Sequence, residues 1–176
     1  MKIIDLTQTI EAGMRVYEGD PEVKIKQVQT LKKHGWNLNL LSFGSHTGTH
    51  VDAPAHMHEG AVALDQLPLE KFIGEAQVVT PESDLPKHIG LVFRSGEVGI
   101  DLFEKIFLAG TPFVVTGNKA TLTVDMERKL LGQGIITFTD LINLEELPDD
   151  RSFGFYGIPL KLKDGDGSPI RAFAII

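Results

Sequence analysis

The feature that most restricts the fold of this chain is a histidine-rich stretch at residues 37–60. It contains four of the six histidines, namely His46, His50, His56 and His58, together with Asp52. Imidazole nitrogens and carboxylate oxygens are common ligands of divalent metals. The fold must therefore hold one short segment so that several of these side chains can meet.

The spacing of the stretch favours a bent strand. His46, His50 and Asp52 share one parity with Gly48, so on an extended backbone their side chains project to the same side. A helix would also bring His46 and His50 together, but it would turn Asp52 away, and the glycine and β-branched residues between them disfavour a helix. In a straight strand the two histidine Cα atoms would lie about 13 Å apart, at roughly 3.3 Å per residue. We therefore expect a bend or bulge, which Gly44 and Gly48 permit.

Other interpretations of the polar residues are weaker. The four clustered histidines are open to a second interpretation as surface residues of a loop, whereas the isolated His34 and His88 are expected to be structural. His56 and His58 cannot both be explained by one ligand shell that already holds His46, His50 and Asp52, and His58 is the weaker candidate of the two. Ser42 and Ser45 stand near histidines and offer an alternative nucleophilic site.

Composition limits the remaining classes. The 176 residues carry a formal net charge of −7 with no basic run, which argues against nucleic acid as a partner. There is no cysteine, so any metal must be held by nitrogen and oxygen. No apolar run approaches the roughly 20 residues that span a bilayer, and the start of the chain lacks a signal-peptide pattern, so we expect a cytoplasmic protein with no membrane contact. The length predicts a single domain over residues 1–176.

The rest of the chain alternates between short strands and helices. A parallel βαβ segment is predicted from apolar runs and two amphipathic helices, the first of them capped by Asp101. We also expect a half-exposed strand over residues 23–28 and a turn at residues 164–167 in which Asp166 pairs with Arg171. The predicted βαβ elements are strands at residues 76–80, 91–94, 112–116 and 134–138, and helices at residues 102–107 and 124–131.

The histidine stretch also carries a resemblance. Residues 46–56, HTGTHVDAPAH, match the HxGTHxDxPxH signature of the metal-dependent cyclase-like hydrolases, a family that includes bacterial kynurenine formamidase and isatin hydrolase. Further similar stretches are found near the start, at residues 4–7 and 19–21, and near the end, at residues 159–162 and 166–171. The resemblance therefore spans nearly the whole chain.

The resemblance implies a fold, a site and a partner. The fold is a mixed α/β single domain of the swivelling β/β/α type. The implied metal ligands are His46, His50 and Asp52, the implied general acid/base is His56, and Tyr17 matches an aromatic residue at the substrate-binding mouth. Zinc or manganese is the expected ion, one per chain, and the protein is expected to act on a small molecule as a homodimer or a larger homo-oligomer.

The chain also departs from the family pattern. Members usually add a histidine on the helix near residues 124–131 and a glutamate or glutamine in the strand that ends near Leu141, and this chain has neither. Glu127, Asp125 and Asp140 are the candidate substitutes. Two functions follow from the resemblance: a hydrolase of a small amide, lactam or lactone that uses a metal-activated water, or a non-catalytic member with a degenerate site that serves in binding or regulation.

Overall fold

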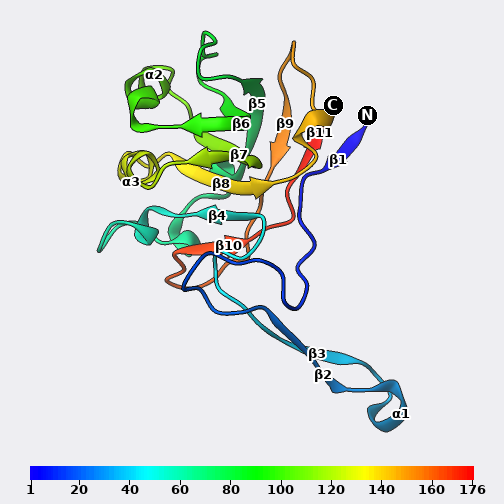
Figure 1. Ribbon diagram of the computed structural model, residues 1–176. Coiled ribbons are helices and arrows are strands. Elements are labelled where there is room, and N and C mark those ends of the chain that lie inside the picture. Colours follow the sequence, from blue (N-terminus) through cyan, green and yellow to red (C-terminus); the bar gives the residue numbers. More distant parts are fainter.

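A nine-stranded mixed sheet forms the frame of the protein, for which a computed structural model describes residues 1–176 (Figure 1). Along the sheet the strands are β1 (Ile3–Asp5), β11 (Phe173–Ile175), β9 (Phe153–Tyr156), β5 (Ile73–Val79), β6 (Gly90–Val98), β7 (Phe113–Leu122), β8 (Ile136–Leu141), β4 (His50–Asp52) and β10 (Gly167–Pro169). A separate ribbon pairs β2 (Lys24–Gln29) with β3 (Leu38–Ser42).

Helices are few and short. They are α1 (Leu31–His34), α2 (Phe103–Leu108) and α3 (Val124–Gly132). Five 3-10 turns complete the regular structure: Pro54–His56, Leu64–Gln66, Leu69–Phe72, Ile100–Leu102 and Leu144–Glu146. None of the helices is long and apolar enough to cross a membrane.

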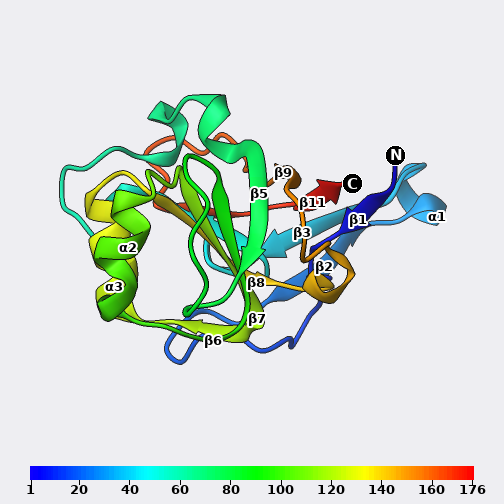
Figure 2. The ribbon, with the colours of Figure 1, turned by 90° about the horizontal axis from the view of Figure 1, so that it is seen from above.

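The four central strands, β5 to β8, run parallel, and α2 and α3 connect them on one face (Figure 2). Leu91 and Phe93 of β6 point to this face, where they join Met126 and Leu130 of α3 in one buried cluster. The predicted βαβ segment is therefore confirmed. Strands β6 and β7 extend beyond the predicted runs, because their polar second halves pair in register as far as Leu122.

The opposite face of the sheet holds the larger core. Phe113, Phe138 and Phe155 meet at its centre, with ring centroids between 5.0 and 5.5 Å apart. Phe138 belongs to β8 and Phe155 to β9, which three strands separate in the sheet order. Contact between them shows that the sheet curls around this aromatic core.

Two local predictions were wrong. Asp101 does not cap α2, because it lies inside the 3-10 turn Ile100–Leu102, whose own backbone bonds lead directly into the helix. The strand expected at residues 23–28 forms as β2, but it is not half-buried: every residue from Lys24 to Val28 is exposed. The alternation of apolar and polar residues correctly predicted a strand, but it did not predict whether another part of the chain would cover its apolar side chains.

Candidate metal centre

The strand β4 divides its three residues between the two faces of the sheet. Val51 enters the aromatic core, while Asp52 lies on the opposite face, where it contacts Thr137, which in turn contacts Glu127 of α3. His50 has the same parity as Asp52 and so points to the same face. His46 lies in the turn that precedes β4. The expected bend falls at Gly48, whose φ of +61° is a left-handed conformation that glycine adopts at little cost.

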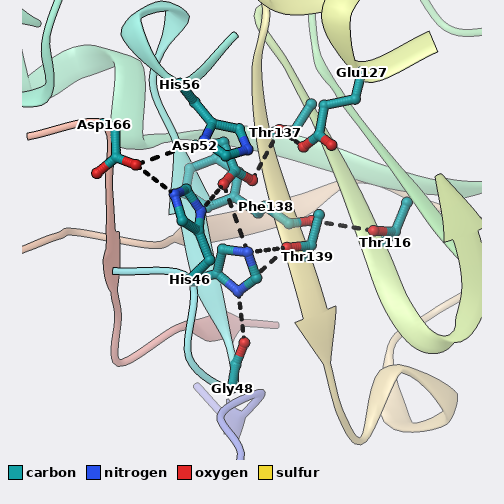
Figure 3. A network of polar contacts seen from close by, with 11 residues as sticks. His46, Gly48, Asp52, His56, Thr116, Glu127, Thr137, Phe138, Thr139 and Asp166 are labelled. Atoms are coloured by element: carbon teal, nitrogen blue, oxygen red, sulfur yellow. Dashed lines mark hydrogen bonds and ion pairs between the residues drawn. The ribbon is translucent and has the colours of Figure 1, made fainter. Parts of the chain in front are cut away.

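This bend brings the three predicted ligands together (Figure 3). His46 Nδ1 lies 2.5 Å from Asp52 Oδ1, and His50 Nε2 lies 3.5 Å from the same oxygen. One ligand atom from each of the three residues lies within 4.8 Å of the others. His50 and Asp52 are buried, so the cluster is shielded on the side of the sheet.

The protonation of His50 suits a metal ligand. Its Nδ1 lies 2.7 Å from the carbonyl oxygen of Gly48, which can only accept a hydrogen bond, so Nδ1 carries the proton. Nε2 is then the nitrogen that carries the lone pair, and it accepts a hydrogen bond from the Thr139 hydroxyl at 2.9 Å, which an ion bound to Nε2 would replace. Metal-binding histidines are typically oriented by such a backbone contact at the other nitrogen. The donor set of this chain therefore fits a divalent ion.

A second group of ligand atoms shares His46. Asp166 Oδ2 lies 2.8 Å from His46 Nε2 and 3.6 Å from His56 Nδ1. The predicted pairing of Asp166 with Arg171 is wrong, since Arg171 binds Asp5 at 2.6 Å. Strand β10 pairs with β4, and this pairing places Asp166 beside the histidines.

Two threonines of β8 complete the inner side of the site, and sequence reasoning missed both. Antiparallel pairing sets Thr139 opposite His50 and Thr137 opposite Asp52. The Thr137 hydroxyl lies 3.1 Å from Asp52 Oδ2 and 3.0 Å from Glu127 Oε1. The signal available in the sequence was the alternation of Thr137 and Thr139 with apolar residues along β8, which indicates that one face of a buried strand is polar.

Among the three acidic candidates for the missing ligands, Glu127 is the one that shares a hydrogen-bond partner, Thr137, with Asp52. It extends from α3 to Thr137, while Asp125 is exposed beside Arg128. Burial, together with the negative charge of Asp52, raises the pKa of Glu127 to about 8. Burial also raises the pKa of Asp140, which lies in the left-handed conformation at the end of β8. At neutral pH Glu127 is therefore mainly the carboxylic acid, which can donate to Thr137 while Thr137 donates to Asp52.

The charges of the site are balanced by His46. Burial opposes its protonation, but hydrogen bonds to Asp52 and Asp166 raise the pKa of His46 to about 9. Burial opposes ionisation of Asp52, yet the contact with His46 holds the pKa of that carboxyl below its ordinary value. Metal ligands must be deprotonated, so metal binding at this site requires His46 to release its proton.

The remaining predicted residues lie in different surroundings. The ring of His56 is 4.0 Å from that of His46 between centroids, and burial, followed by the charge of His46, lowers the pKa of His56. His58 turns away and contacts the carbonyl oxygen of Arg128 at 2.8 Å.

Tyr17 is 75% exposed in the loop before β2, and its role in substrate binding stays a prediction. Neither Ser42 nor Ser45 forms a hydrogen bond with a histidine, so the nucleophilic alternative has no support in the geometry.

Fold and site together define an α/β protein with a candidate metal centre of histidine and carboxylate groups. The chain belongs to the family described as "Putative cyclase", which matches residues 4–92. It is 28% identical over 206 residues to a kynurenine formamidase of Salinibacter ruber, covering 98% of this chain and 96% of that protein. It is 31% identical over 199 residues to an uncharacterised protein of Methanocaldococcus jannaschii, with both chains fully covered.

Solved structures show the same fold. Isatin hydrolase A from Labrenzia aggregata, solved with benzyl benzoate, superimposes with a TM-score of 0.82 at 22% identity over 99% of this chain and 93% of that one. Isatin hydrolase A from Ralstonia solanacearum gives a TM-score of 0.78 at 22% identity over 98% and 91%. The predicted family and mixed α/β fold are confirmed. The relatives with a named activity are hydrolases, which confirms the predicted enzyme class and does not favour the non-catalytic alternative.

Proposed function

We propose that this chain is a metal-dependent hydrolase that cleaves the carbon–nitrogen bond of a small amide or lactam, or the ester bond of a related lactone. The observation that carries the proposal is the convergence of His46, His50 and Asp52, with Nε2 of His50 facing Asp52. The names of the relatives, kynurenine formamidase and isatin hydrolase, support an acyl substrate attached through nitrogen.

The ion in this proposal is zinc or manganese, one per chain, held by His46, His50 and Asp52. When bound, such an ion polarises a carbonyl oxygen and lowers the pKa of the water that it holds to about 7. Thr137 holds the carboxylate of Asp52 in place from the side of the sheet, and the carbonyl oxygen of Gly48 holds the imidazole of His50 through Nδ1. One ion is favoured over two because Glu127 contacts Thr137, and no histidine lies near it on α3.

His56 is the proposed general acid/base. It lies just after Asp52 in the 3-10 turn Pro54–His56 and keeps part of its side chain in contact with solvent. Its Nδ1 faces Asp166, so Nε2 is the nitrogen left to take a proton from water and to deliver it to the leaving amine. Asp166 orients the ring in this arrangement.

Metal content per chain of the purified protein tests the proposal first. We expect about one equivalent of manganese or zinc by elemental mass spectrometry, and His46→Ala should lose it. About two equivalents would mean that Glu127 serves as a further ligand. If no metal binds even after incubation with both ions, the proposed mechanism is wrong.

A pair of histidine variants then separates catalysis from binding. His56→Ala should retain the metal and lose turnover of an aryl formamide or isatin by about 10²–10⁴-fold, the usual contribution of a general acid/base. His58→Ala is the matched control, because it belongs to the same stretch but contacts only the backbone of α3 among polar groups. Turnover that survives in His56→Ala would show that another group moves the proton.

A further inference from the structure

The polar groups around His46 form two ligand sets that share this one side chain (Figure 3). We call His46, His50 and Asp52 the inner set, and His46, His56 and Asp166 the outer set. Nδ1 of His46 faces Asp52 of the inner set, and Nε2 faces Asp166 of the outer set at 2.8 Å. The two sets therefore use opposite nitrogens of one imidazole ring.

The outer set has the separations that a metal ion requires. Ligand atoms that surround a tetrahedral zinc ion at about 2.0–2.2 Å are separated from one another by roughly 3.4 Å. Asp166 Oδ2 lies 2.8 Å from His46 Nε2 and 3.6 Å from His56 Nδ1. The two imidazole rings lie 4.0 Å apart between centroids and are tilted by 38°. Small movements of these side chains would therefore bring all three onto one ion.

The backbone holds Asp166 in this place. The amide of Ala53 donates to the carbonyl oxygen of Asp166 at 2.9 Å, so the loop before β10 is tied to the chain directly after Asp52. A Cβ added at Gly167 would lie 2.5 Å from Cε1 of His46, so the ring can lie against β10 only because residue 167 has no side chain. Asp166 thus belongs to a shaped site, although 120 residues separate it from His46.

The two sets differ in their access to solvent. The side chains of Asp166 and His56 are 46% and 29% exposed, whereas those of His50 and Asp52 are 11% and 2% exposed. An ion that arrives from solution therefore meets the outer set first. The negative charge of Asp166 favours this encounter, because a charged group at a surface raises the local concentration of its counter-ions.

We propose that the outer set is a metal-loading site, which captures a divalent ion from solution and passes it through His46 to the inner set. A neutral imidazole has one lone pair, on either Nδ1 or Nε2, so His46 binds an ion in one set at a time. In the transfer the bonds from the ion to Nε2 of His46, to His56 and to Asp166 break, and bonds to Nδ1 of His46, to His50 and to Asp52 form. Nδ1 gives a proton to water and Nε2 takes one from water, so the charge of the ring is unchanged.

Loading in this order also affects catalysis, and this consequence rests on the proposed function. An ion in the outer set occupies His56, the proposed general acid/base, so hydrolysis cannot begin in that state. Movement of the ion to the inner set releases His56 and completes the active centre in the same step.

Isothermal titration of the metal-free chain with zinc tests whether the outer set binds an ion by itself. His50→Ala removes a ligand that only the inner set uses, so this variant should keep one zinc ion at weaker affinity. Asp166→Asn added to His50→Ala should weaken binding at least about tenfold more, since even groups that only orient a ligand affect affinity by about 10–100-fold. Asp164→Asn, added instead, is the matched control and should change nothing. Asp164 is exposed in the same loop, belongs to neither set, and has φ of +54°, which asparagine tolerates.

The nitrogen of His46 that binds zinc reports the position of the ion. Proton–nitrogen correlation spectra of the histidine side chains distinguish Nδ1 from Nε2. The zinc-bound nitrogen of His46 should be Nδ1 in the wild type and Nε2 in His50→Ala. Binding through the same nitrogen in both proteins overturns the proposal.

Loading kinetics test the path with the inner set intact. Stopped-flow mixing of the metal-free chain with zinc and a fluorescent zinc indicator gives the association rate. Asp166→Asn should slow association by about tenfold, whereas Asp164→Asn should stay within about twofold of the wild type. If His50→Ala fails to fold by far-UV circular dichroism, these two rates decide alone.

The outcomes distinguish the loading site from the proposed function. A folded His50→Ala that binds no zinc, or an Asp166→Asn chain that loads as fast as the wild type, overturns the loading site and leaves the hydrolase proposal standing. A wild-type chain that binds no zinc overturns both.

Discussion

Removal of the Thr137 hydroxyl should weaken the metal site without changing any ligand. Thr137 is fully buried, and its single hydroxyl proton lies between two carboxyl groups, 3.1 Å from Asp52 and 3.0 Å from Glu127. Thr137→Val keeps the shape of the side chain and deletes the donor. A hydrogen bond to a charged group contributes about 1.5–3 kcal/mol, so the free energy of unfolding of the metal-free protein should fall by about that amount.

The same variant should bind zinc or manganese about 10–100-fold more weakly, because groups that orient a ligand typically affect affinity to that extent. Isothermal titration calorimetry gives the affinity, and urea unfolding monitored by circular dichroism gives the stability. Thr116→Val is the matched control. Thr116 is also buried, in the neighbouring strand β7, and its hydroxyl reaches only the carbonyl oxygen of Phe138, at 3.4 Å.

Thr116→Val should cost about 0.5–1.5 kcal/mol at most and leave the affinity for metal unchanged, since its hydrogen bond is long and neutral. The reasoning fails if Thr137→Val binds metal within threefold of the wild type, or if both variants lose affinity equally. The first result would mean that Asp52 keeps its orientation without Thr137. The second would mean that general destabilisation of the sheet, and not the lost donor, controls the site.

Two further predictions concern the frame of the protein. A Cβ added at Gly90 would lie 2.0 Å from the ring of the fully buried Phe113, so Gly90→Ala should lower the free energy of unfolding by roughly 3 kcal/mol. Gly60→Ala, with open space around it and φ of +73°, should cost only about 1 kcal/mol, and equal melting temperatures would contradict this account. The hydrogen bond from Arg171 holds the pKa of Asp5 below its ordinary value of 3.8, so Asp5 stabilises the fold above that pH and the effect disappears as pH falls. The stability difference between wild type and Asp5→Asn should therefore be present at pH 7 and vanish in acid, and a difference that persists at low pH would rule out the ionic origin.

The ligands of the site were predictable because they are close in sequence. His46, His50 and Asp52 share one parity within seven residues, so a single bend brings them together. Gly44 and Gly48 were the two predicted positions for it, and only Gly48 has a positive φ. The βαβ segment was predictable for a similar reason, since its strands and helices follow one another along the chain. Local patterns were sufficient in both cases.

Other parts of the site depend on strand order, which no local pattern contains. Asp166 and Thr139 reach the histidines, and Thr137 reaches Asp52, only because β10 and β8 flank β4. A shift of one residue in either register would turn them to the opposite face. Arg171 was assigned to its sequence neighbour, whereas pairing of β1 with β11 supplies Asp5, 166 residues away. The exposure of the ribbon formed by β2 and β3 was missed because an alternating pattern does not show which surface, if any, covers the apolar side chains.

The two faces of β8 have a consequence for how this protein can change over evolutionary time. Ile136 and Phe138 pack in the aromatic core, while Thr137 and Thr139 contact the candidate ligands. Selection on the packing of the core therefore acts on one parity of the strand, and selection on the geometry of the site acts on the other. Replacements at Thr139 can adjust the site while the core remains intact, so new specificities can arise here without prior loss of the fold.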